Sequence, residues 1–314
     1  MIYTTAPQRS PQKTRPRIEP VVLAGVLATI GHTPLVRFDN IYCKLEHMNP
    51  GGSIKDRVAL AIIEDAEASG QLQPGDIIVE ASSGNTGISL AMVGAVKGYG
   101  VIIVMPENMS EERRVILGAL GADVILTSKE GNLKEAIATA ERIGAQPGYF
   151  LSRQFSNPAN IKAQECMAKE VLDELGPVDA VVAGVGTGGT LMGLGRVMKR
   201  ANPNVKVIAV EPEESPALSS GSVPKVHDHL IQGIGDGFIP DLVDTGLVDQ
   251  VVTVSSEAAI GMTKNLWRKY GLLAGISSGA NMIAAYLASL NYDKVVTVIP
   301  DRAERYLSLR LTDL

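Results

Sequence analysis

The stretch Asn49-Pro50-Gly51-Gly52-Ser53-Ile54-Lys55-Asp56-Arg57 leads from a glycine-rich loop into a helix and places one lysine at the junction. The proline and the two glycines disfavour a helix, whereas apolar residues recur at helical spacing over positions 58 to 63. Lys55 is therefore expected in a first helical turn, where the positive end of the helix dipole lowers the pKa of an amine. A neutral amine is the nucleophile that condenses with an aldehyde. A lysine taken alone is more often a solvated surface residue, so the other motifs of the chain decide its role.

The composition favours an α/β protein that binds neither nucleic acid nor a membrane. The 314 residues suffice for two domains, or for one large α/β domain with an inserted lobe. Hydrophobic residues make up 45% and aromatic residues 4%, and the 32 glycines suit many tight turns between strands and helices. The net charge of −5 argues against a phosphate-binding basic surface. The longest apolar runs are too short for a membrane span.

The cysteines, the histidines and the first 20 residues carry no strong functional signal. Cys43 and Cys166 lie far apart without a paired motif, which predicts a reducing, cytoplasmic environment and no disulfide framework. The four histidines lack any zinc-ligand spacing, so no metal site is expected. Residues 1–20 hold four prolines and four basic residues without an apolar signal region, and we expect a flexible arm there.

Strands and helices alternate along the chain in two successive runs. The apolar patterns predict strands at 41–46, 76–80, 101–105, 122–126, 148–151, 178–182, 205–210 and 295–299, and helices at 21–30, 88–98, 111–120, 133–143, 191–201, 257–270 and 280–290. Residues 31–37 are expected to form an extended turn, and 215–239 an irregular segment. The polar residues 153–158 are a plausible border between two lobes. Alternation of this kind indicates parallel sheets, whose ligand sites lie at the carboxyl ends of the strands.

The loop Gly184-Val185-Gly186-Thr187-Gly188-Gly189-Thr190 follows an apolar strand and opens a helix, so its backbone N–H groups suit a phosphate. Its glycines also fit the GxGxxG pattern, and Glu211 lies 22 positions beyond Gly189, as the ribose-binding acid of a dinucleotide fold would. On this stretch alone a dinucleotide and a phosphate monoester both remain open. Thr187 and Thr190 favour the monoester, because hydroxyls add donors for a terminal phosphate.

Two further glycine loops open helices. They are Ser82-Ser83-Gly84-Asn85-Thr86-Gly87 and Gly275-Ile276-Ser277-Ser278-Gly279. Each alone is consistent with a well-capped helix, since Ser and Asn are common caps. Three such loops together with a first-turn lysine are difficult to explain by packing alone and indicate one ligand site.

Five motifs in this order resemble the cysteine synthase (O-acetylserine sulfhydrylase) and cystathionine β-synthase family. They are 49–57, 82–87, 186–190, Ile231-Gln232-Gly233-Ile234-Gly235 and 275–279, and the similarity runs from about residue 29 to residue 307. The resemblance implies a two-lobed fold type II pyridoxal-phosphate enzyme, like the tryptophan synthase β chain, in which each lobe is a parallel or mostly parallel sheet with helices on both faces. It implies a large cofactor-binding domain from 1–46 and 158–314, and a small mobile domain from 47–157. It also selects pyridoxal phosphate over a nicotinamide.

The resemblance also implies roles for individual residues. Lys55 would form the internal Schiff base with pyridoxal 5′-phosphate and later remove the substrate's α-proton. Asn85 would bond the pyridine 3′-oxygen, and Ser277 would face the ring nitrogen. The implied phosphate-binding residues are Gly186, Thr187, Gly188, Gly189 and Thr190. The implied substrate-binding residues are Ser82, Ser83, Asn85, Thr86, Gln154, Gly233 and Ile234.

The reaction that the resemblance implies is β-replacement on O-acetyl-L-serine, in which sulfide displaces acetate to give L-cysteine. Asp301-Arg302 precedes the family's Glu304-Arg305-Tyr306 ending, as in members that use other nucleophiles. Homocysteine or an amine as nucleophile therefore stays open, and so does a dehydratase-like lyase acting on serine or threonine. A homodimer and a complex with serine acetyltransferase are the implied assemblies. A catalytically inactive binding module is the alternative of a different class, and the intact lysine and loops argue against it.

Overall fold

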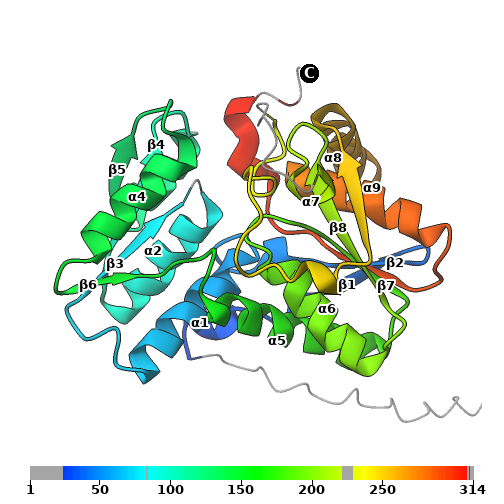
Figure 1. The fold of residues 1–314 in the computed structure, drawn as a ribbon, viewed down its shortest axis with the longest axis horizontal. Helices are drawn as coiled ribbons and strands as arrows, with labels where there is room; N and C mark the ends of the chain where they lie inside the picture. The colour runs from blue at the N-terminus through cyan, green and yellow to red at the C-terminus, as the bar shows by residue number, and fades with distance from the viewer. Residues whose placement is uncertain (1–23, 83, 110, 221–228, 310, 312–314) are drawn as a thin grey trace, which may run out of the picture.

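The computed structural model describes residues 24–309 except 83, 110 and 221–228, and residue 311 (Figure 1). The expected arm at 1–20 lies outside these residues. The expected helix at 21–30 lies partly outside them, and its described part is a 3₁₀ helix, η1 (Val26–Thr29).

The larger sheet has six strands in the order β1-β2-β10-β7-β8-β9. The strands are β1 (Leu35–Phe38), β2 (Ile41–Lys44), β7 (Ala180–Gly184), β8 (Lys206–Pro212), β9 (Gln250–Val254) and β10 (Val295–Val298). All neighbouring pairs are parallel except β1 and β2. In β7, Ala180 and Val182 belong to one core and Val181 and Ala183 to another. The strand is therefore buried on both faces, which explains its uninterrupted apolar sequence.

Helices cover both faces of the larger sheet. α8 (Ser256–Tyr270) and α9 (Ile276–Ser289) pack on one face, and α5 (Pro158–Leu175) and α6 (Gly189–Ala201) pack on the other. The α5 helix begins with a strong local signal, because Asn157 caps the Ala159 amide and Pro158 occupies the first turn. Short helical turns, α7 (Ala217–Ser220) and η3 (Thr245–Leu247), lie in the connections.

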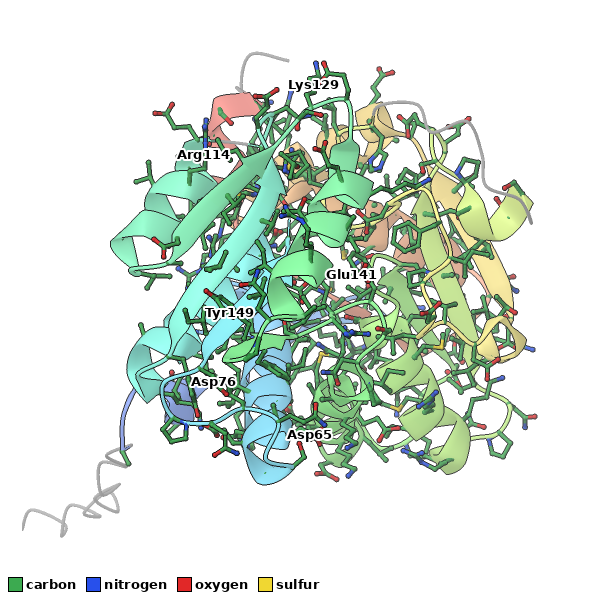
Figure 2. The ribbon with its side chains drawn as sticks, turned by 60° about the vertical axis from the view of Figure 1, so that its left-hand side comes forward. Asp65, Asp76, Arg114, Lys129, Glu141 and Tyr149 are labelled. Atoms are coloured by element: carbon green, nitrogen blue, oxygen red, sulfur yellow. The ribbon has the colours of Figure 1, made fainter. Side chains whose placement is uncertain are left out.

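The smaller sheet has four parallel strands in the order β5-β4-β3-β6. These are β3 (Ile77–Ala81), β4 (Gly100–Pro106), β5 (Asp123–Thr127) and β6 (Tyr149–Leu151). α1 (Lys55–Ala68), α2 (Asn85–Lys97) and α3 (Glu111–Ala119) share a core with one face of the sheet. α4 (Asn132–Gly144) covers the other face, where Figure 2 labels Glu141.

Three segments join the two halves. α1 packs against both α2 and α5, and η2 (Glu46–Met48) precedes the lysine loop. η4 (Ala303–Leu309) follows β10 and lies between the two sheets at the top of Figure 1. The four-stranded sheet falls wholly within residues 77–151. The domain limits given above, 1–46 with 158–314 and 47–157, stay a prediction.

Candidate active site

A pocket with about 890 Å³ of empty space lies where the carboxyl ends of strands from both sheets face each other. Residues that follow β3, β6, β7 and β10 all contribute to its wall. The predicted site residues that line it are Lys55, Ser82, Asn85, Thr86, Gln154, Gly186, Thr187, Gly188, Thr190, Gly233, Ile234 and Ser277. Gly189 does not line the pocket, and Ser83 lies outside the described residues.

Lys55 is the first residue of α1, as the sequence predicts. Burial lowers the pKa of its amine to about 8, against the opposing influence of the Asp236 and Asp301 carboxylates. Burial, more than the helix terminus that the sequence suggested, is thus the main cause of the shift. The loop before Lys55 is held in place because the Ile54 amide donates to the Pro300 carbonyl at 2.8 Å.

The loop at the start of α6 has little room for side chains. A Cβ at Gly186 would lie 2.2 Å from the Gly233 carbonyl oxygen, so glycine is required at that position. Gly188 has a φ of 85°, in the left-handed region that glycine favours. The first amides of α6, which begins at Gly189, have no intrahelical acceptors. With the Thr187 and Thr190 hydroxyls, this loop is a suitable cradle for a phosphate.

Glu211, which the sequence suggested as a possible ribose ligand, has a structural role instead. Glu211 accepts hydrogen bonds from the Leu218 and Ser219 amides at 2.7 and 2.9 Å, and so holds the start of α7. It does not line the pocket. The dinucleotide interpretation therefore has no support from this residue.

The loop before α2 combines capping with a polar wall. The Ser82 hydroxyl accepts from the Gly84 and Gly87 amides at 3.1 Å, so it organises the loop as a capping residue does. The Thr86 hydroxyl donates to Gln154 Oε1 at 2.6 Å, and Gln154 Nε2 donates to the Ala81 carbonyl at 2.8 Å. These bonds fix the polar side chains around the first turn of α2.

Several pocket residues were not predicted as site residues. They include Asp236, Asp301, Tyr306, Arg113 and Phe155. Asn160, which does not line the pocket, donates from Nδ2 to Thr187 Oγ1 at 3.0 Å and to the Gln154 carbonyl at 2.9 Å. One available signal was the position of Asp301 just after the last strand, at the edge where parallel sheets carry their ligand sites.

Within the described ranges, no group of three or more His, Cys, Asp and Glu residues is arranged to hold a metal ion. None of the described helices is both long enough and apolar enough to cross a membrane.

The comparisons with known proteins agree with this geometry. The family model described as "Pyridoxal-phosphate dependent enzyme" matches residues 26–301. The chain belongs to this family. It is 46% identical over 301 residues to a cysteine synthase of Staphylococcus aureus, covering 91% of this chain and 96% of that one. The resemblance drawn from the five motifs is thereby confirmed, and the protein is a pyridoxal-phosphate-dependent enzyme.

Solved structures support the fold class. Cysteine synthase from Entamoeba histolytica has a TM-score of 0.88 and 37% identity, over 99% of this chain and 95% of that chain. An O-ureido-L-serine synthase has a TM-score of 0.88 and 38% identity, over 93% of this chain and 96% of that chain. The predicted two-lobed, fold type II α/β architecture is confirmed.

The pocket fits pyridoxal phosphate on its own geometry. Lys55 and the loop of Thr187 and Thr190 share one cavity, so an amine and a phosphate cradle lie together. Asn85 Oδ1 is buried without a hydrogen-bond partner among the described residues, as expected of an amide that faces a ligand. Ser277, near the start of α9, lines the same cavity.

Glu80 is a buried carboxylate that holds the segment of Ser152 and Gln154 beside the pocket. Its Oε2 accepts from the Ser152 hydroxyl at 2.6 Å and from the Gln154 amide at 3.0 Å, while Oε1 accepts from the Ala81 amide at 2.9 Å. Burial nevertheless raises the pKa of Glu80 to about 7, because the three hydrogen bonds only partly offset the loss of water.

Glu80→Gln is expected to flatten the pH dependence of stability. Between pH 4.5 and about 7 the folded wild type retains a proton on Glu80 that the unfolded chain releases, so its stability falls as the pH rises. The difference between these pKa values corresponds to about 3 kcal/mol. Urea unfolding at pH 4.5, 6 and 8 measures the free energy of unfolding of both proteins. As the pH rises, the value for wild type should fall relative to that for Glu80→Gln by up to this amount. Parallel pH curves for the two proteins would contradict the assignment.

Proposed function

We propose that the protein catalyses β-replacement on O-acetyl-L-serine, forming L-cysteine and acetate with sulfide. The observation that carries the proposal is the pocket shared by Lys55 and the loop of Thr187 and Thr190. Relatives named cysteine synthase support the choice of substrate and nucleophile. In this assignment Lys55 holds the coenzyme through its amine, Gly186 to Thr190 hold the phosphate, Asn85 donates to the 3′-oxygen and Ser277 faces the ring nitrogen.

When bound, pyridoxal phosphate supplies an electron sink next to the α-carbon of the amino acid. Lys55 Nζ takes the proton from that carbon as acetate leaves, and returns it after the nucleophile has added. A pKa of about 8 leaves about a tenth of this amine neutral at pH 7, and only the neutral form accepts a proton. The Ser277 hydroxyl, unlike a carboxylate, does not hold a proton on the ring nitrogen. This suits departure of a β-leaving group better than long-lived carbanion chemistry.

The substrate carboxylate is placed at the first turn of α2. Backbone amides there have no intrahelical acceptors and lie at the positive end of the helix dipole. Ser82, Ser83, Asn85, Thr86 and Gln154 complete this cradle in the proposal. Gly233 and Ile234 close on the amino acid from the opposite side.

A second candidate uses the same first half-reaction with another nucleophile. Two carboxylates, Asp236 and Asp301, line the pocket with Lys55. A carboxylate near the incoming group is able to accept a proton from an amine or a thiol larger than sulfide. The likeness to an O-ureido-L-serine synthase supports this alternative.

The test is steady-state turnover of O-acetylserine with sulfide, homocysteine and small amines in parallel, with acetate release as the common readout. We expect kcat/KM to be highest with sulfide. A clear preference for homocysteine or an amine would select the second candidate. Release of a keto acid from serine or threonine alone would replace both with a dehydratase-like lyase.

The proposal includes the assembly and its location. The resemblance implies a homodimer able to bind serine acetyltransferase, and the two cysteines without a paired motif favour a reducing, cytoplasmic location. A monomeric mass by light scattering would contradict the dimer.

A further inference from the structure

One buried carboxylate connects two segments that both line the pocket. Asp301 follows β10 and is 1% exposed. Its Oδ2 accepts from Asn85 Nδ2 at 2.7 Å and from the Tyr306 hydroxyl at 2.6 Å. Asn85, which lies 216 positions before Asp301, opens α2 beside the smaller sheet, whereas Tyr306 lies in η4, so the carboxylate links these two elements.

The hydrogen-bonding chemistry of Asp301 leaves Asn85 one orientation. Tyr306 remains a donor, because burial and the neighbouring Asp301 raise the pKa of its hydroxyl well above the ordinary value. Burial raises the pKa of Asp301, while the bonds from Tyr306 and Asn85 and the charges of Arg113 and Arg305 favour its ionised form. In that form Oδ2 only accepts, and an amide oxygen turned toward it would meet another oxygen. The Asn85 amide must direct its nitrogen at Asp301. This leaves its second N–H and its Oδ1 for the pocket, and Oδ1 has no partner in the described part of the chain.

We propose that Asp301 is a positioning residue, which fixes the Asn85 amide so that its second N–H donates to the 3′-oxygen of pyridoxal phosphate. The inference rests on the proposed function, which assigns Asn85 to that oxygen. A donor directed at the 3′-oxygen favours its anionic form and so changes both the affinity and the electronic spectrum of the bound coenzyme. Without Asp301 the two amide orientations would become similar in energy, and the donor would be lost part of the time.

This role is separable from the part that the Asp301 backbone plays in the fold. The Gly275 amide donates to the Asp301 carbonyl at 3.0 Å, and the Ile54 amide donates to Pro300 at 2.8 Å. Neither bond involves the side chain. A side-chain variant therefore removes the link to Asn85 while the backbone ties to the lysine loop and to α9 remain.

The experiment measures coenzyme binding and spectrum without turnover. Holoprotein is prepared for wild type, Asp301→Ala, Asp301→Asn and Tyr306→Phe, and the Kd for pyridoxal phosphate is obtained by titrating the resolved apoproteins. We expect Asp301→Ala to bind about tenfold more weakly, the loss of one good hydrogen bond, with a displaced visible absorbance band. Asp301→Asn keeps a carbonyl oxygen that accepts from Asn85, so it should stay within about threefold of wild type. Tyr306→Phe removes only the other donor and should behave similarly.

A double-mutant cycle makes the test specific. If Asp301 acts through Asn85, then adding Asp301→Ala to Asn85→Ala should cause no further loss of affinity. Additive losses, a wild-type spectrum for Asp301→Ala, or equal losses for Asp301→Ala and Tyr306→Phe would each overturn the proposal. Asp301→Ser, too short to reach Asn85, serves where alanine unfolds the chain. Failure of the wild type itself to bind the coenzyme would overturn the proposed function, and the inference with it.

Discussion

Replacing Lys55 with alanine is expected to lower kcat/KM for O-acetylserine by at least about 10³-fold, because the pocket loses the group that moves the α-proton. Lys55 is the one lysine among the residues that line the described pocket, so no other amine is placed to substitute for it. The variant should also hold pyridoxal phosphate without a covalent bond. Acetate release and borohydride treatment followed by peptide mass analysis check both expectations.

Two control variants test whether Lys55 acts as a base or only through its positive charge. Lys55→Arg should be as inactive as Lys55→Ala, because a guanidinium stays charged and cannot act as a base. Lys129→Ala, an exposed lysine labelled in Figure 2, should keep wild-type turnover and labelling. Retention of more than about a tenth of wild-type activity in Lys55→Ala would show that another group moves the proton.

The parts of the site that the sequence predicts are those encoded in short motifs. Lys55, the loop from Gly186 to Thr190 and Ser277 each follow a strand or open a helix, and a glycine pattern marks each position. The parallel topology then brings these segments to the carboxyl ends of the strands, where all of the named residues except Gly189 line one pocket. The roles given to them individually stay predictions.

Elements with weak local signals were missed. The buried face of α5 includes Asn160 and Gln164 among small alanines, so its apolar periodicity is faint. β1 was expected as an extended turn, yet it pairs antiparallel with β2 across a tight connection in which Asp39 has a φ of 54°. β9 is an edge strand that pairs only with β8 in the described sheet. One of its five residues is buried and the others are exposed or half-buried, so its apolar pattern is weak.

The missed site residues depend on tertiary contacts. Asp301 reaches Asn85 across 216 positions, and Asn160 connects Thr187 of the phosphate loop to Gln154, which lies outside the five motifs. The sequence pattern does not reveal which distant residues form such pairs. Asp236 directly follows the motif at 231–235, but only the folded loop places it in the pocket with Lys55.

The start of α1, and hence Lys55, is anchored by a buried ion-pair network that no motif revealed. Arg57 donates from Nε and Nη2 to Glu46 at 2.8 and 2.9 Å, and from Nη1 and Nη2 to Glu170 at 2.6 and 2.8 Å. The Glu46 side chain is fully buried, and Lys44 forms a further ion pair with Glu170 at 2.9 Å. Burial alone would raise the pKa of Glu170, but the bonds from Arg57 and Lys44 outweigh it and lower the pKa to about 2.

Arg57→Met is expected to destabilise the protein by about 3–5 kcal/mol, because it leaves Glu46 buried without its cation while keeping much of the side-chain volume. The wild type should also lose stability as the pH falls from 4.5 toward 2, where Glu170 must be protonated, and this loss should be weaker in the variant. Urea unfolding across this pH range measures both effects.

The control for this prediction lies on the same two helices. Lys162 on α5 pairs with Asp65 on α1 at 3.1 Å, but the two side chains are 65% and 48% exposed. Water screens such a pair, so Lys162→Ala should cost no more than about 1 kcal/mol. Equal losses in Arg57→Met and Lys162→Ala would mean that burial adds nothing to the α1–α5 contact. A loss near zero in Arg57→Met would show that the carboxylates find other partners, and that Lys55 is positioned by its loop alone.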